Sequence, residues 1–271
     1  MEILGSEPGG WTPFAGGTEL MVQYGSGLLA KRRLLSIWNL PELRQIDVSG
    51  GEARIGAGCT FSEIRRSQTL AREFPLLGLA ASWTGSLANQ NRGTIGGNIV
   101  NASPAADSSP ALLVYDAELR ITSAGGARSL AYESFHLGYK RVDLRPDELL
   151  LRFELPRGEA SALHYARKVG PRNAQAISKV ALAAVGRIAN GVVEHVRIGA
   201  ASLGPTPLRC YETERFLLGR QLNTKTVYEA KAVLMSESKP IDDIRSTAEY
   251  RTQVGANLLE EFLTQLTHYY R

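Results

Sequence analysis

The chain has 271 residues, of which 44% are hydrophobic and 21% are charged, and its formal net charge is +4. This is the composition of an ordinary globular protein with a sizeable core, and so small a basic excess argues against a nucleic-acid-binding protein. Two distant cysteines cannot hold an iron–sulfur cluster, and no apolar stretch could cross a bilayer, so we expect reduced thiols in a cytoplasmic protein without membrane insertion.

The first informative stretch is PFAGGTEL, residues 13–20, which predicts a short extended segment, a glycine turn and a helix. Thr18 is the expected N-cap, and Leu20, Met21 and Tyr24 then share one helix face. A glycine pair before a helix leaves backbone N–H groups uncovered, and such groups bind anions with help from the helix dipole. Taken alone, however, a glycine pair is more often only a turn.

The next elements are predicted from periodicity and turn residues. Residues 33–40 read as a buried strand that Pro41 ends, and residues 45–58 as a hairpin that turns at 50–51. Residues 60–83 indicate a helix in two pieces, the second of which starts near Pro75.

A second glycine turn, TIGGN at residues 94–98, resembles the first. Thr94 and Asn98 add side-chain donors to its amide groups, and two separate anion sites suit a pyrophosphate. Neither turn matches the GxGxxG or P-loop pattern, so these residues predict a nucleotide cofactor without a Rossmann site. Asp107 follows the second turn, and the chemistry allows it to bind ribose or a base amine, or to cap the next helix.

The rest of the chain predicts a change of architecture near residue 160. Ser109 and Pro110 are the expected N-cap and first residue of a short helix. The remaining predicted elements are a hairpin over 118–132, a strand over 148–156, a boundary at 157–161, strands over 162–169, 179–189 and 192–201, and helices after them. In the last of these helices, one apolar stripe is formed by Val254, Leu258, Leu259, Phe262, Leu263 and Leu266.

Three stretches together carry a family resemblance: AGGTEL, TIGGNIVNASPAADSSPALL, and YARKVGPRNAQAISKV at residues 165–180. They resemble the FAD-binding subunits of the molybdenum hydroxylases, which include those of the carbon monoxide and xanthine dehydrogenases. The resemblance covers nearly the whole chain. It implies an α+β fold, with a bipartite FAD-binding domain of the vanillyl-alcohol-oxidase type over 1–157. A C-terminal domain with a three-stranded antiparallel sheet and helices is implied over 162–271.

The resemblance also implies which residues contact FAD. The first pyrophosphate loop would be formed by Phe14, Ala15, Gly16, Gly17, Thr18, Glu19 and Leu20. The second would be formed by Thr94, Ile95, Gly96, Gly97 and Asn98. Asp107 matches an acid at the adenosine half, Leu150 an apolar residue beside the flavin, and Lys168 a lysine at the carbonyl edge of the isoalloxazine. Thr84 falls where some relatives carry an aromatic residue.

The function implied by the resemblance is electron transfer. Electrons from a large molybdopterin-binding subunit would pass through a small subunit with two 2Fe-2S clusters to FAD on this chain, and then to NAD, quinone or oxygen. Such a complex can be dimeric. The scattered histidines (His136, His164, His195 and His268) indicate no catalytic base. Two alternatives stay open: a stand-alone FAD oxidoreductase that uses the same fold without molybdenum partners, and a flavin-free assembly or scaffold protein, which the short lead-in before the first turn allows.

Overall fold

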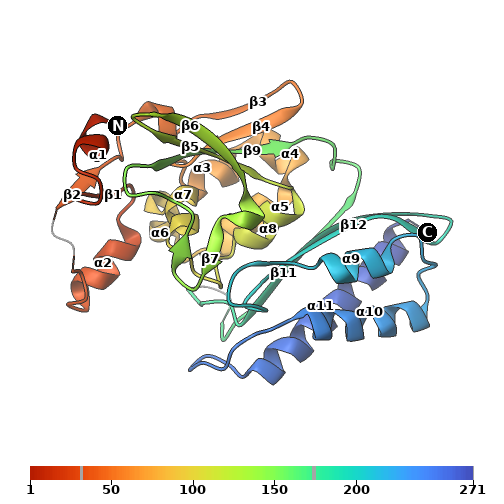
Figure 1. The fold of residues 1–271 in the computed structure, drawn as a ribbon. Coiled ribbons are helices and arrows are strands. Elements are labelled where there is room, and N and C mark those ends of the chain that lie inside the picture. Colours follow the sequence, from red (N-terminus) through yellow and green to blue (C-terminus); the bar gives the residue numbers. More distant parts are fainter. Residues whose placement is uncertain (31–32, 173–174, 271) are drawn as a thin grey trace.

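The protein is built in alternating layers of sheet and helix (Figure 1). This computed structural model describes residues 1–30, 33–172 and 175–270, so residues 173–174 of the third quoted stretch lie outside the described residues. A five-stranded sheet forms one outer layer, and a group of short helices packs between it and a four-stranded sheet (Figure 1). The last three helices cover the far face of the second sheet.

The N-terminal elements are short and lie at one end of the molecule. They are α1 (Glu2–Ser6), β1 (Thr12–Phe14), α2 (Thr18–Gly25) and β2 (Leu34–Ser36), and β1 pairs with β2 in parallel. The predicted strand over 33–40 is therefore shortened to three residues. It is also only half-buried, because it pairs with β1 alone and has no sheet on its other side.

The five-stranded sheet has the order β3-β4-β9-β5-β6 and is antiparallel throughout. Its strands are β3 (Ile46–Ser49), β4 (Glu52–Gly56), β5 (Glu118–Ser123), β6 (Gly126–Ala131) and β9 (Leu149–Pro156). Both predicted hairpins are confirmed, and their turns use Gly50 and Gly126, which have positive φ angles. A 3₁₀ turn, η1 (Pro41–Leu43), precedes β3.

The helices under this sheet differ in detail from the prediction. They are α3 (Phe61–Arg66), α4 (Gln68–Glu73), α5 (Pro75–Trp83), α6 (Leu87–Arg92), α7 (Ile95–Val100) and α8 (Ser109–Val114). The two predicted pieces over 60–83 are three helices, because the Ser67 hydroxyl caps α4 and interrupts the first piece. The N-cap of α8 is Ser108, so the prediction of Ser109 is wrong by one residue.

The four-stranded sheet has the order β10-β11-β12-β13 and contains the three predicted strands. These are β10 (Leu163–Val169), β11 (Val180–Ala189) and β12 (Val192–Ala201), to which the two-residue strand β13 (Leu208–Arg209) adds an edge. The predicted Asn190–Gly191 turn is confirmed, since both residues have positive φ angles. In the first sheet, η2 (Tyr132–Ser134), β7 (His136–Gly138) and β8 (Arg141–Val142) lie in the connection between β6 and β9.

The second sheet joins the two halves of the chain, because β11 is buried on both faces. Ala183 and Val185 belong to the core under the first sheet, whereas Leu182 and Ala184 face the last helices. Those helices are α9 (Tyr211–Leu217), α10 (Thr224–Glu237) and α11 (Ala248–Tyr269). The predicted apolar stripe of α11 packs on β11, as expected from its period.

A single glycine permits the tight contact between α8 and β12. A Cβ atom on Gly199 would lie 2.7 Å from the backbone oxygen of Pro110, which is closer than any side chain allows. The helical layer, which carries the second glycine turn at the start of α7, is thus pressed directly against the second sheet.

Candidate functional site

The first glycine turn ends in a helix that has no side-chain cap. Gly17 is the N-cap of α2 with a φ angle of 75°, so the prediction of Thr18 as the cap is wrong and Thr18 is the first helical residue. A left-handed N-cap is a conformation that glycine adopts without steric cost. In the described part of the chain no side chain accepts from the first amide groups of α2, so they are available to an anion.

The two glycine turns lie directly against each other. A Cβ atom on Gly16 would stand 1.7 Å from the carbonyl oxygen of Arg92 and 3.1 Å from the backbone nitrogen of Gly93. Arg92 and Gly93 immediately precede the second turn. The structure therefore brings residues 14–20 and 94–98 together, as the pyrophosphate hypothesis requires, and it does so through a contact that only glycine permits.

The second turn is buried, and its amide groups already have partners. The N–H of Ile95 donates to the carbonyl of Cys59 at 3.0 Å, and that of Gly96 to the carbonyl of Ala57 at 2.9 Å. The N–H of Gly97 donates to the Thr94 hydroxyl at 3.1 Å. The expectation of bare amides at this turn is therefore wrong in this structure, because the start of α7 docks on residues 57–59.

Gly97 and the side chain of Asn98 are the parts of the second turn that face outward. Gly97 is exposed, and a Cβ built on it would lie 3.0 Å from the Thr94 hydroxyl oxygen with no other side chain of the described residues within 4 Å. The Oδ1 atom of Asn98 accepts from the Ser108 hydroxyl at 2.6 Å, which leaves the amide NH₂ to face a ligand. These two positions keep the second turn accessible to a phosphate after its backbone amides have been used.

Asp107 and Lys168, predicted separately, form a buried ion pair at 2.6 Å. Asp107 also accepts from the Ser178 hydroxyl, and the Lys168 ammonium donates to the carbonyl of Trp83 at 3.0 Å. Burial raises the pKa of Asp107 above its usual range, and the Lys168 ammonium opposes that shift. Asp107 makes no side-chain cap on α8, so the capping alternative is wrong.

The resemblance implies that Asp107 lies at the adenosine half of FAD and Lys168 at the isoalloxazine. In this structure the two side chains are buried and joined at 2.6 Å, and their contacts with FAD stay predictions. Ser178, which sequence reasoning missed, completes the pair, and a hydroxyl directly before a predicted strand was its only signal.

The two remaining predicted contacts lie on different sides of the helical layer. Thr84 follows α5, and its hydroxyl donates to the carbonyl of Ala80. Its chain neighbour Trp83 supplies the carbonyl that accepts from Lys168. Leu150 lies in β9 and is buried in the core opposite Ile121. Thr84 is therefore close to the ion pair, whereas Leu150 contributes to the packing under the first sheet.

Lys140 is the second residue that sequence reasoning missed. It lies between β7 and β8, and its ammonium is 2.7 Å from Oδ1 of Asn101 and 3.8 Å from the carboxylate of Glu19. Asn101 ends α7 and Glu19 is in the first turn of α2. No local pattern in the sequence connects Lys140 with the two glycine turns, because more than a hundred residues separate it from Glu19.

The thiols and histidines near the site are structural. Burial raises the pKa of Cys59 to about 12, so its thiol stays protonated and packs behind the second turn. His136 lies with Nε2 3.0 Å from the carbonyl of Ile99, and burial lowers its pKa. Over the residues that the structure describes, no group of His, Cys, Asp and Glu could hold a metal ion.

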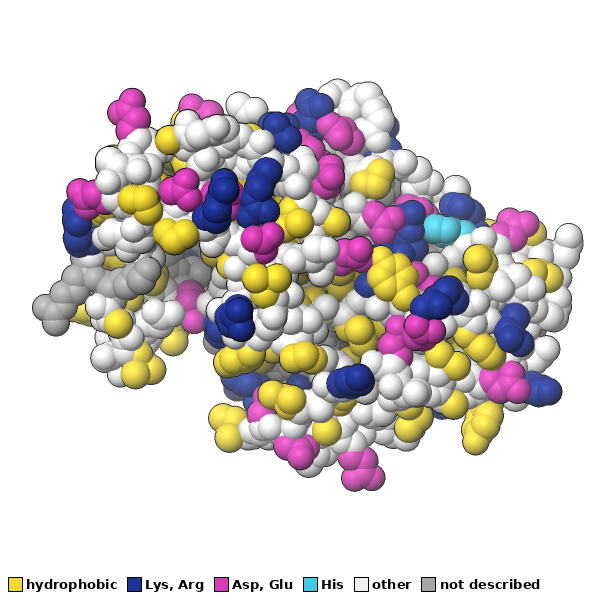
Figure 2. All heavy atoms as spheres, in the orientation of Figure 1, with side chains coloured by type: hydrophobic (Ala, Val, Ile, Leu, Met, Phe, Trp, Pro, Cys, Tyr) yellow, Lys and Arg dark blue, Asp and Glu magenta, His cyan; other side chains and the backbone are white. Residues whose placement is uncertain are grey.

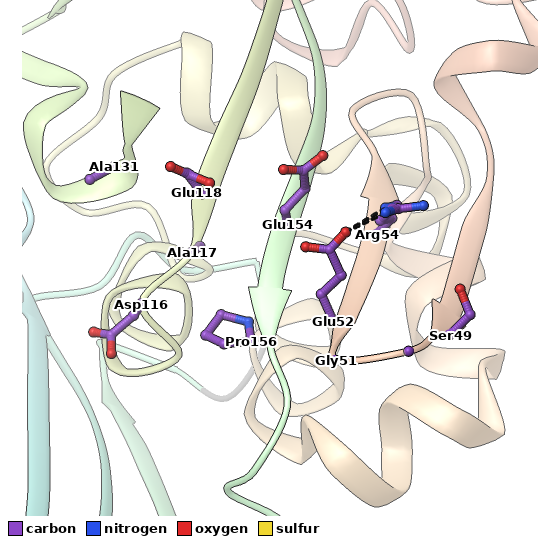
Figure 3. Close-up of a pocket in the computed structure, with 11 residues that line it drawn as sticks. Ser49, Gly51, Glu52, Arg54, Asp116, Ala117, Glu118, Ala131, Glu154 and Pro156 are labelled. Carbon is purple, nitrogen blue, oxygen red and sulfur yellow. Dashed lines mark hydrogen bonds and ion pairs between the residues drawn. The ribbon is translucent and has the colours of Figure 1, made fainter. Parts of the chain in front are cut away.

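A hollow of the surface lined by the ends of β4, β5 and β9 lies away from the predicted site and has the wrong charge for a nucleotide. Figure 3 shows its lining from β4, β9 and the start of β5, where Arg54 pairs with Glu52, and Glu154, Glu118 and Asp116 line the same hollow. None of the predicted site residues lines it. Because its carboxylates outnumber its single guanidinium, it repels a diphosphate.

The helix that follows the first turn exposes apolar side chains. Met21, Val22 and Tyr24 are each about two-thirds exposed, and α2 has no buried residue (Figure 2, lower left). The predicted face of Leu20, Met21 and Tyr24 therefore does not pack inward. An exposed apolar group of this kind is typical of a surface that another molecule covers.

The donor set fits the diphosphate of a dinucleotide at the first turn. The uncapped start of α2 offers amide donors and a favourable dipole, and the space in front of Gly17 is free of backbone. Lys140 reaches the first turn of α2 from the β7–β8 connection, 3.8 Å from the carboxylate of Glu19.

Comparison with known proteins gives a consistent result for the whole chain. Residues 2–158 match the family model of the FAD binding domain in molybdopterin dehydrogenase, and residues 165–266 match that of the CO dehydrogenase flavoprotein C-terminal domain. The chain is 31% identical to the xanthine dehydrogenase FAD-binding subunit of Escherichia coli O157:H7, covering 93% of this chain and 87% of that one. It is 26% identical to the carbon monoxide dehydrogenase medium chain of Hydrogenophaga pseudoflava, over 92% and 86% of the two chains.

Solved structures agree. A chain of carbon monoxide dehydrogenase from Hydrogenophaga pseudoflava superposes with a TM-score of 0.91 at 26% identity, covering 96% of this chain and 90% of that chain. In the described residues, no helix has the length and apolar character that a membrane span needs.

Proposed function

The chain belongs to the family of FAD-binding subunits of molybdopterin dehydrogenases, and we propose from this premise that it is the flavin-bearing electron-transfer subunit of a molybdenum hydroxylase complex. It is an oxidoreductase subunit that binds FAD, and its partners are a large molybdopterin-binding subunit and a small 2Fe-2S subunit. FAD supplies the redox chemistry, and this chain holds and orients it between the iron–sulfur subunit and an outside acceptor.

One observation carries the proposal for the binding site: Gly16 packs against Arg92 and Gly93. That contact places the turn before the uncapped α2 against the residues that lead into the second turn, which supports a site in which one diphosphate reaches both turns. We assign the FAD contacts to residues 14–20 and 94–98, with Asp107 and Lys168 as further predicted contacts.

We also propose a domain division and a cellular compartment for the protein. We place the FAD-binding domain at 1–157 and the C-terminal domain at 162–271, with the polar segment between β9 and β10 as the boundary. We also propose a cytoplasmic location, which two buried free cysteines support because thiols persist in a reducing compartment.

The test is to purify the protein and to determine its FAD content and the subunits that co-purify with it. We expect the chain to purify with bound FAD, seen as absorbance at about 450 nm, and together with a large and a small subunit. Bound FAD without partners would indicate a stand-alone oxidoreductase. A colourless protein that binds no added FAD would overturn the proposal and favour a scaffold role.

A further inference from the structure

Lys140 is held at the point where both glycine turns meet the β7–β8 connection. Its backbone has a φ angle of 56°, and its N–H donates to the carbonyl of Ala102 at 3.3 Å. Asn101 fixes its ammonium at 2.7 Å. A side chain distant in sequence is thus anchored to the end of α7 and directed toward the first turn of α2, where Glu19 lies 3.8 Å away.

The charge at this place requires a cation. Residues 18–25 of α2 include Glu19 and no basic residue, so the helix end that would receive a diphosphate already carries a carboxylate. Like charges so close together disfavour binding unless a positive group lies between them. Lys140 is the charged partner that Glu19 has in the described structure.

The ammonium of Lys140 is free enough to take a phosphate oxygen. Its side chain is 40% exposed and Glu19 is 47% exposed, and a surface ion pair at 3.8 Å is weak. Asn101 accepts one of its three N–H groups, which leaves two for an anion. A charge-assisted bond to a phosphate is stronger than the loose pair that it replaces.

We propose that Lys140 binds the diphosphate of the dinucleotide and offsets Glu19 at the start of α2. This inference rests on the proposed function, since it names a further residue for the same cofactor. It adds a third segment, the β7–β8 connection, to the two glycine turns. Lys140 thereby acts on the diphosphate and not on the flavin.

The experiment measures the dissociation constants of FAD and ADP with flavin-free full-length protein, using flavin fluorescence and its displacement. In Lys140→Ala we expect both ligands to bind about tenfold more weakly, the loss expected for one charge-assisted bond at a partly exposed site. Lys140→Arg should bind both within about threefold of the wild type, because the positive charge is kept. Arg141→Ala removes the same charge from the exposed neighbouring position and should leave both constants unchanged.

The outcomes separate this inference from the proposed function. If the wild type binds neither FAD nor ADP, the proposed function fails. If the wild type binds both and Lys140→Ala binds FAD equally well, the inference is overturned. It is also overturned if the variant loses affinity for FAD but not for ADP, because the contact would then be with the flavin. Thermal unfolding of the flavin-free variants, including Lys140→Gln, checks that each is folded.

Discussion

The first glycine turn lies at the surface before an uncapped helix, whereas the second is buried, capped by Thr94 and hydrogen-bonded to residues 57–59. Each turn contains a glycine pair, but glycine stands at the four positions for three different physical reasons. Gly17 needs its positive φ angle, Gly16 and Gly96 need close backbone contact, and Gly97 leaves space at the surface. A glycine motif therefore specifies separate roles position by position, and substitutions can distinguish them.

The largest effect is expected at Gly96. A Cβ atom there would lie 2.6 Å from both the Cβ and the carbonyl oxygen of Ala57, so backbone must move. We expect Gly96→Ala to lower the free energy of unfolding by about 3 kcal/mol, the upper end of the range for overpacking. Urea unfolding of the flavin-free protein measures it. A loss below about 1 kcal/mol would show that the second turn is not tightly packed.

The next largest effect is expected at Gly97, where a substitution should weaken FAD binding and leave the stability of the fold nearly unchanged. A Cβ atom there would lie 3.0 Å from the Thr94 hydroxyl oxygen, and because the position is exposed, a bulky side chain extends into the space over the turn. We expect Gly97→Leu to weaken FAD binding by at least about 100-fold, since the diphosphate loses its place, while the unfolding free energy changes by less than about 1 kcal/mol. Titration with FAD and urea unfolding test both parts. Stoichiometric FAD in the purified variant would remove Gly97 from the site.

The threonine hydroxyl groups of the two turns are expected to differ in their contribution to stability, by a smaller amount. Thr94 caps α7 through the Gly97 N–H, whereas Thr18 caps nothing. Thr94→Ala should cost about 1 kcal/mol of unfolding free energy, as for other N-cap losses. Thr18→Ala, the matched control, should leave stability unchanged. Equal losses in the two variants would mean that the first turn is capped in solution as well.

Local sequence patterns correctly predicted those elements whose structure depends mainly on neighbouring residues in the chain. The hairpins at 50–51, 125–126 and 190–191 and the apolar stripe of α11 are in place because turn residues and periodicity act over a few neighbours. For residues 33–40 the predicted length and burial of the strand were wrong, because the burial of a strand depends on which elements pair beside it, and no local pattern reports that.

The site shows the same limit. The sequence located both glycine turns, yet it could not show that residues 57–59 would use the amides of the second. Nor could it show that Asp107 would pair with Lys168, or that Lys140 would reach Glu19, because these contacts join segments far apart in the chain. Which donors remain free for a ligand is decided by tertiary packing.

The smallest predicted effect concerns the support behind the second turn. Thr60 bridges Thr94, and Glu63 accepts from both the N–H and the hydroxyl of Thr60, at 2.7 and 2.9 Å, and from Arg44. Burial opposes the ionisation of Glu63, but these donors outweigh it and hold the pKa of its carboxyl below its usual range. The first turn has no such support in the described structure.

The sign of the pH dependence follows. Because the pKa of Glu63 is lower in the folded state, its contribution is present above the unfolded value and is lost as the pH falls through the folded one. We expect Glu63→Gln to be less stable than the wild type by less than about 1 kcal/mol at about pH 6, and the difference to be smaller at about pH 3. Urea unfolding at both pH values measures the difference. A gap that widens toward acid would mean that the second turn depends on a different carboxylate.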